Sequence, residues 1–178
     1  KEYADAGADI LITNTFGASQ FRLQEYDAYS KLKDINKRAV EIARKAGGDR
    51  CFVAGDIGPC GDTIHPTGSL PFLKAVDIFY EQAQALVEGG ADAIIVETMF
   101  DSLDFKAALS GVRQVSSDIP VIALMTFNTD ALSDTGISPE SCVAIGEGFH
   151  VDVVGANCSV GPDAMMEVIR RMKTVTQT

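Results

Sequence analysis

The sequence is short of positive charge. Its 178 residues include 15 lysines and arginines against 25 aspartates and glutamates, a net charge of −10 at pH 7. Proteins that bind nucleic acid or anionic membranes present clusters of lysine and arginine, so neither partner is expected. No apolar run approaches the roughly 20 residues that cross a bilayer. The first residues also lack the pattern of a secretory signal peptide.

Cysteine and histidine are scarce as well. Four cysteines lie far apart in a chain that is 46% hydrophobic, namely Cys51, Cys60, Cys142 and Cys158. Disulfide frameworks belong to small secreted domains, so we expect reduced thiols and a cytoplasmic protein. His65 lies in a polar loop and His150 precedes a strand, so neither is favoured as a catalytic base.

Apolar runs of strand length alternate with amphipathic stretches of helix length. The predicted strands are 8–14, 51–57, 91–98, 120–127 and 151–158, and the predicted helices are 19–27, 30–47, 72–89, 102–116, 138–147 and 162–173. The strands are rich in Ile and Val on both faces, as parallel strands between helices should be. Pro71, Ser102 and Ser138–Pro139 suit helix starts, and the Gly pairs 47–48 and 89–90 suit helix ends.

Two segments repeat one pattern. AGADILITNTFGAS (6–19) and GGADAIIVETMFDS (89–102) share a small residue, Gly, Ala, Asp, a strand, a polar pair and Phe. Such repetition favours a (β/α)8 TIM barrel. The rival is a doubly wound sheet, but no G-x-G-x-x-G follows the first strand. We therefore predict an α/β fold, an incomplete (β/α)8 barrel of about five central units, as a single domain over 1–178 truncated at both ends.

In a parallel barrel, catalytic groups come from the carboxyl ends of the strands. Those ends carry Asn14-Thr15, Asp56, Glu97-Thr98, Thr126 with Asn128, and Asn157-Cys158. Acids, amides, hydroxyls and one thiol are thus expected at one rim. The aspartates at the strand starts, Asp9, Asp92 and Asp152, belong to the opposite rim, where capping and stability are the expected roles.

Glu97 and Cys158 each allow two interpretations. Glu97 ends a buried strand, where a carboxylate is costly unless it is paired. It either forms a salt bridge with a lysine or a helix N-terminus, or receives a cationic substrate group such as an α-amino group. Cys158 is either a small buried hydrophobe or, beside Asn157 and before a Gly-Pro turn, a nucleophile or metal ligand. Cys51 and Cys142 are expected to pack in the core. Cys60, in the loop GPCGD, has no evident partner.

Taken in order, AGADILITNTFGAS, AGDIGPCGD, GGADAIIVETMFD, PVIALMTF and GANCSVGP resemble the homocysteine S-methyltransferase family. Within it, the resemblance is strongest to the homocysteine-binding barrel of the cobalamin-dependent methionine synthases. It covers nearly the whole chain, and GANCSVGP and GADAIIVET are its specific parts.

The resemblance implies a zinc ion held by three cysteine thiolates, of which Cys158 is one. Its neighbour Asn157 would hold that ligand in place. The other two ligands would be an adjacent Cys-Cys pair, which this sequence lacks. Glu97 matches the glutamate that contacts the amino group of homocysteine. The segment around Phe16 and Gly17 matches a substrate-contacting loop, and Asn14 and Asp56 are further expected substrate contacts. No residue is expected to act as an acid, base or nucleophile.

The resemblance predicts zinc-dependent methyl transfer to the thiolate of homocysteine, which gives methionine. Methylcobalamin, recharged from methyltetrahydrofolate on partner modules, is the favoured donor, and S-methylmethionine or betaine are alternatives. A metal-free barrel lyase or aldolase is a different class, but no lysine ends a strand to form a Schiff base. A non-catalytic binding module is a third possibility. The isolated 178 residues are expected to bind zinc weakly and to show no turnover.

Overall fold

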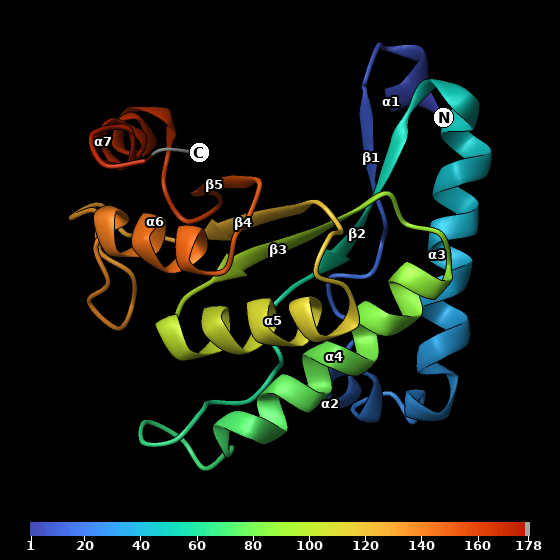
Figure 1. Ribbon diagram of the computed structural model, residues 1–178, viewed down its shortest axis with the longest axis horizontal. Coiled ribbons are helices and arrows are strands. Elements are labelled where there is room, and N and C mark those ends of the chain that lie inside the picture. Colours follow the sequence, from blue (N-terminus) through green and yellow to red (C-terminus); the bar gives the residue numbers. More distant parts are fainter. Residues whose placement is uncertain (177–178) are drawn as a thin grey trace.

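A computed structural model describes residues 1–176, so the last two residues of the predicted domain lie outside it. Strands and helices alternate along the chain (Figure 1). The strands are β1 (Ile10–Ile12), β2 (Phe52–Ile57), β3 (Ala93–Met99), β4 (Val121–Met125) and β5 (Val153–Ala156). The helices are α1 (Glu2–Asp5), α2 (Gln20–Gln24), η1 (Tyr29–Lys31), α3 (Leu32–Gly47), η2 (Gly48–Arg50), α4 (Phe72–Glu88), α5 (Ser102–Val115), α6 (Pro139–Gly148) and α7 (Pro162–Lys173).

All five strands are parallel, and each pairs with the next in the sequence. The order is β1-β2-β3-β4-β5, with Ile10 beside Phe52 at one edge and Met125 beside Ala156 at the other. A doubly wound sheet reverses its strand order at a switch point, whereas a barrel adds each strand beside the last. The α/β fold with a parallel sheet of an incomplete barrel is thus confirmed, and the described sheet is open at β1 and β5.

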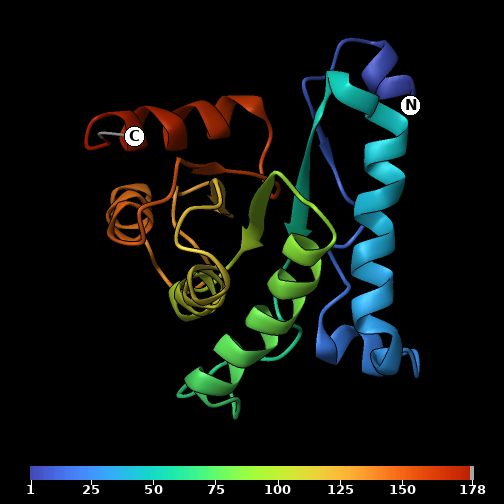
Figure 2. The same ribbon diagram turned by 45° about the vertical axis from the view of Figure 1, so that its right-hand side comes forward.

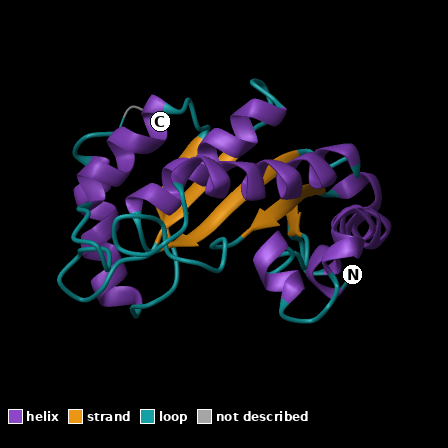
Figure 3. Cartoon of the chain, turned by 90° about the horizontal axis from the view of Figure 1, so that it is seen from below, coloured by secondary structure: helices purple, strands orange, loops and turns teal. Residues whose placement is uncertain are grey.

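The helices cover one face of this sheet, as Figures 2 and 3 show. Gly55 faces α4, because a Cβ atom there would lie 3.0 Å from Leu86. Side chains alternate along a strand, so Phe52 and Asp56 project from the other face. That face is the barrel interior. Its side chains are exposed toward the open edges of the sheet, among them Ile12 on β1, Phe52 on β2 and Val153 on β5.

Aspartates fasten the amino ends of the strands, as expected. Asp92 Oδ2 accepts a hydrogen bond from Val53 N at 2.7 Å and from Arg44 Nη2 at 2.6 Å. Asp152 Oδ2 accepts from Val121 N at 2.8 Å. The structural role is confirmed for these two residues. Asp9 contributes its carbonyl oxygen, which accepts from Phe52 N at 2.8 Å.

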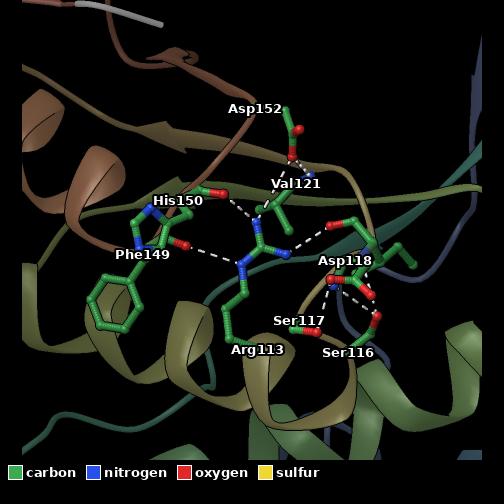
Figure 4. A network of polar contacts seen from close by, with 9 residues as sticks. Arg113, Ser116, Ser117, Asp118, Val121, Phe149, His150 and Asp152 are labelled. Carbon is green, nitrogen blue, oxygen red and sulfur yellow. Dashed lines mark hydrogen bonds and ion pairs between the residues drawn. The ribbon is translucent and has the colours of Figure 1, made fainter.

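Arg113 of α5 reinforces the same rim, beside the segments that precede β4 and β5 (Figure 4). Its guanidinium group donates to three backbone carbonyl oxygens, those of Phe149 at 3.0 Å, His150 at 2.5 Å and Ile119 at 2.7 Å. The side chain is 17% exposed, so water competes little for these bonds. One cation thereby joins the end of α5 to the loops that lead into β4 and β5.

The predicted elements are all present, but several boundaries were wrong. The first strand is three residues rather than seven, and the helix expected over 19–27 is only Gln20–Gln24. α5 begins at Ser102, as predicted, and Asp101 caps it, with its side chain accepting from Leu103 N at 2.7 Å. The signals at Pro71, Ser138 and the two glycine pairs are confirmed. Across the described residues, no helix has the length and apolar character needed to span a membrane.

Candidate functional site

Asn157 is the centre of a polar cluster at the carboxyl ends of β3 and β5. Its Nδ2 donates to Glu97 Oε2 at 2.7 Å and to Thr98 Oγ1 at 2.8 Å, and lies 3.3 Å from Cys158 Sγ. Its Oδ1 accepts from Thr98 N at 3.0 Å. These bonds span about 60 residues of sequence. The amide therefore fixes the expected substrate contact and the expected metal ligand relative to each other.

The backbone is unusual at both ends of this cluster. Thr98, Cys158 and Ser159 have φ values of 60°, 61° and 62°. Left-handed backbone in residues other than glycine costs about 1 kcal/mol or more, and such residues concentrate at functional sites. The pairing of β3 with β4 is also irregular between Val96 and Met99. The chain thus leaves regular strand geometry where Glu97 and Thr98 turn toward β5.

Cys158 is the exposed thiol of the chain, which removes its interpretation as a buried hydrophobe. Thr98 Oγ1 lies 3.6 Å from its sulfur. Cys51, Cys60 and Cys142 are buried, as a packing role requires. Burial raises the pKa of the Cys60 and Cys142 thiols to about 12, so both stay protonated.

Asp56 lies beside Glu97 in the barrel interior and is 5% exposed. Burial, followed by the charge of Glu97 and a hydrogen bond with Glu97, raises its pKa to about 8. Its Oδ1 has no hydrogen-bond partner among the described residues. At pH 7 this carboxyl group is therefore protonated.

Hydroxyl and amide groups hold the backbone around Asp56. Thr13 Oγ1 accepts from Asp56 N at 2.9 Å, and Thr15 Oγ1 donates to Asp56 O at 2.7 Å. Gln82 of α4 donates to Thr15 O at 2.8 Å. The end of β2 is consequently fixed to β1 and α4 through buried bonds, and a buried hydrogen bond resists rearrangement.

The other expected substrate contacts lie elsewhere on the rim. Phe16 lines a cavity of about 570 Å³ together with Thr98 and Phe100, and packs against Gly58, where a Cβ atom would be 2.7 Å from its ring. Gly17 is exposed. Asn14 lines a different cavity, at the β1 edge against α3, and makes no hydrogen bond to the Asn157 cluster in residues 1–176. The structure therefore groups Glu97, Asp56, Asn157 and Cys158, but not Asn14.

The threonines at the strand ends have a role that the sequence pattern alone did not assign to them. Thr98 is the largest omission, since it bonds Asn157 twice and approaches Cys158. Thr126 donates to Asn157 O at 3.1 Å. Threonine recurs at positions 13, 15, 98 and 126, at the ends of three strands, β1, β3 and β4. That recurrence was the available signal.

A metal ion would find one thiol donor here. Within residues 1–176, no group of three His, Cys, Asp or Glu side chains could hold a metal. Cys158 nevertheless fits a ligand position, because it is exposed at a strand end and Asn157 donates toward its sulfur. Such a neighbour holds a metal ligand in one orientation.

A parallel barrel segment with an exposed thiol, a glutamate and an amide at its rim defines a barrel-type ligand site at the strand ends. The family model described as homocysteine S-methyltransferase matches residues 1–178, and the chain belongs to that family.

Two curated relatives are called methionine synthase. The protein of Mycobacterium leprae (strain TN) is 34% identical over 182 residues, and that of Mycobacterium tuberculosis (strain ATCC 25618 / H37Rv) is 33% identical. The match covers 97% of this chain but 15% of each relative. Among solved structures, the metallated form of the homocysteine methyltransferase MmuM from Escherichia coli superimposes with a TM-score of 0.84 at 19% identity, over 98% of this chain and 66% of that one. This likeness supports the barrel fold.

Proposed function

We propose that this chain is the central part of a homocysteine-binding barrel, in which methyl transfer to the sulfur of homocysteine gives methionine. The observation that carries the proposal is the Asn157 cluster. One amide side chain contacts Glu97 at 2.7 Å and lies 3.3 Å from Cys158. A site for an amino acid thiol needs both a receptor for the ammonium group and a centre for the sulfur, held at a fixed separation.

Cys158 is proposed as one zinc ligand, with the remaining ligands supplied from outside residues 1–176. Zinc bound by cysteine thiolates with an open position deprotonates a coordinating thiol, and so makes it nucleophilic at neutral pH. Asn157 orients the Cys158 sulfur through its Nδ2, and Thr98 lies on the same side at 3.6 Å. Their role is to keep the ligand in one position.

Glu97 is proposed to accept hydrogen bonds from the α-ammonium group of homocysteine. Its carboxyl group is half-buried, and the amide of Asn157 leaves one of its oxygens without a partner from that side chain. Asp56 lies next to it and is proposed as a second contact. Phe16 lines the adjoining rim cavity and is proposed to contact the substrate from the β1 side, together with Gly17.

The proposed methyl donor is methylcobalamin, recharged from methyltetrahydrofolate on other modules. The support is the similarity to methionine synthases, of which this chain matches 15%. Assaying the complete natural polypeptide with methylcobalamin, S-methylmethionine and betaine in turn separates the donors. Methyl transfer from either of the latter two, and none from methylcobalamin, would contradict this choice.

The zinc content of the complete polypeptide tests the proposal. We expect about one zinc per polypeptide, and loss of that zinc in Cys158→Ala. Cys142→Ala is the matched control, since this thiol is buried in α6 and should leave zinc unchanged. Full zinc occupancy in Cys158→Ala would refute the metal-ligand role.

A further inference from the structure

The carboxyl groups of Asp56 and Glu97 meet inside the barrel. β2 pairs with β3 so that Asp56 lies beside Ile95, and Glu97 is two residues further along β3. Because alternate residues of a strand share a face, both carboxyl groups project from the interior face. Glu97 is the charged neighbour of Asp56, and its charge helps to raise the pKa of the Asp56 carboxyl group. Two neighbouring carboxyl groups do not readily both ionise.

Hydroxyl, amide and thiol groups, rather than basic side chains, are the neighbours of this pair among the described residues. The segment after β1 contributes the hydroxyls of Thr13 and Thr15 near the Asp56 backbone, and α4 contributes the amide of Gln82. From β5, the amide of Asn157 donates to Glu97, and the Cys158 thiol is the titratable group next to that amide. Within residues 1–176, no lysine, arginine or histidine forms a salt bridge with either carboxyl group.

The two carboxyl groups therefore have oxygen atoms that can accept further hydrogen bonds. Asp56 is 5% exposed and its Oδ1 lacks a partner, although buried polar atoms are nearly always hydrogen-bonded. An ammonium group has three donors and no acceptor. It can bond both carboxylates and still reach the unpartnered oxygen.

We propose that Asp56 and Glu97 hold one proton between them while the site is empty, and that the α-ammonium group of the amino acid displaces this proton on binding. The inference rests on the proposed function, because it takes an amino acid as the ligand. The proton between the two carboxyl groups leaves for water, and ammonium N–H groups bond the two carboxylates in its place. Each bound amino acid thus releases one proton held by the free protein.

The amount released depends on pH. With the pKa of Asp56 at about 8, the empty pair holds about 0.9 proton at pH 7 and about 0.5 at pH 8. Methionine is the suitable probe, because its thioether has no proton to lose. Homocysteine would add a proton from its own thiol.

Calorimetric titration of the complete, zinc-loaded polypeptide with L-methionine, in buffers of different ionisation enthalpy, counts the released protons. We expect about 0.9 at pH 7, falling to about half a proton at pH 8. Asp56→Asn should release less than about 0.2 proton per methionine bound. Wild type should prefer methionine over 4-(methylthio)butanoate, which lacks the amino group, and this ratio of affinities should fall at least tenfold in Asp56→Asn. Glu97→Gln is a second variant, should Asp56→Asn not fold. It should lose the same preference, and should release fewer protons than wild type at pH 7, because the charge of Glu97 no longer helps to raise the pKa of Asp56 while its burial remains.

Asp104→Asn is the matched control. Asp104 is also a buried acid whose Oδ1 has no partner, with its pKa raised by burial to about 6, but Cys60 rather than Glu97 is its neighbour. It should release the wild-type number of protons. The proposal is overturned by methionine binding without proton release, by equal release in Asp56→Asn, or by no methionine binding at all. Those results leave the zinc measurement on Cys158→Ala unaffected, so failure of the proposed function is seen separately.

Discussion

Replacing Asp56 by asparagine should stabilise the fold by an amount that grows with pH. Asp56 is buried, and its pKa is raised to about 8 first by that burial and then by Glu97. In the unfolded chain the pKa returns to about 3.9. At a pH between these two pKa values, Asp56 must take up a proton when the chain folds. This costs about 1.4 kcal/mol of folding free energy for each pH unit above the unfolded pKa. At pH 7 the upper bound is about 4 kcal/mol, and relaxation around a charged Asp56 reduces it to about 2 kcal/mol.

The sign follows from the raised pKa. A protonated Asp56 contributes its full stability below about pH 4, and this contribution is lost progressively as the pH rises toward 8. Asparagine does not titrate, so Asp56→Asn should match wild type near pH 4, gain on it steadily up to pH 8, and then keep a constant advantage. The added stability would be accompanied by weaker binding of the substrate's ammonium group, as is common when a buried polar group serves a binding site.

Reactivity of the buried Cys142 thiol in urea measures this domain alone, even within a longer polypeptide. Cys142 is fully buried in α6, away from Asp56, so it reacts with a thiol reagent only after the barrel segment opens. Both proteins are compared at the same pH, which cancels the pH dependence of the reagent. Asp104→Asn should show a gain that levels off near pH 6 instead, because its pKa is about 6. A gain for Asp56→Asn that is the same at pH 5 and pH 8 would refute the reasoning.

Two further predictions separate the site from its scaffold. Asn157→Ala should weaken zinc binding by the complete polypeptide about 10- to 100-fold, because it removes the amide that holds Cys158 and Glu97. Competition with a chelator measures the zinc affinity. Unchanged affinity would contradict the orienting role. Arg113→Ala should lower the free energy of unfolding by about 2–4 kcal/mol, since three backbone carbonyl oxygens lose a charged donor, and should leave zinc affinity unchanged. Arg38→Ala is the control, because Arg38 forms an exposed i,i+3 ion pair with Glu41. Urea denaturation of both variants measures the free energy of unfolding, which should change by less than about 0.5 kcal/mol in Arg38→Ala.

The sheet was predictable because its signal is repeated and local. Ile and Val runs recur before polar strand ends, and each crossover helix has a recognisable start or end in the sequence. Strand ends were less predictable, since apolar residues continue past the last ladder bond. The run over 151–158 holds only four strand residues, Val153–Ala156, and Cys158 beyond them adopts left-handed backbone.

The residues of the site were predictable by position, and their contacts were not. Glu97 and Cys158 were singled out because they end strands, and a supporting role was expected for Asn157 toward its neighbour in sequence. The bond from Asn157 to Glu97 depends on how far β3 and β5 are rotated and staggered across β4, which no local pattern encodes. The same holds for the pairing of Asp56 with Glu97, which needs the register of β2 and β3.

The two copies of the repeated segment explain how one scaffold carries a specific site. Gly7 and Gly90 both have positive φ, at 99° and 89°, and both precede an Ala-Asp pair that leads into a strand. Up to that point the copies share a backbone conformation, at the rim where the Asp92 carboxylate bonds Val53 N of the neighbouring strand and the Asp9 carbonyl oxygen bonds Phe52 N. They diverge at the other end, where Asn14 and Glu97 occupy the same place in the repeat. Asn14 stays outside the cluster, whereas Glu97 enters it because β3 is irregular after Val96 and Thr98 turns its backbone to meet Asn157. The chemistry of the site is therefore set at the carboxyl ends of the strands, and the stability of the sheet at their amino ends.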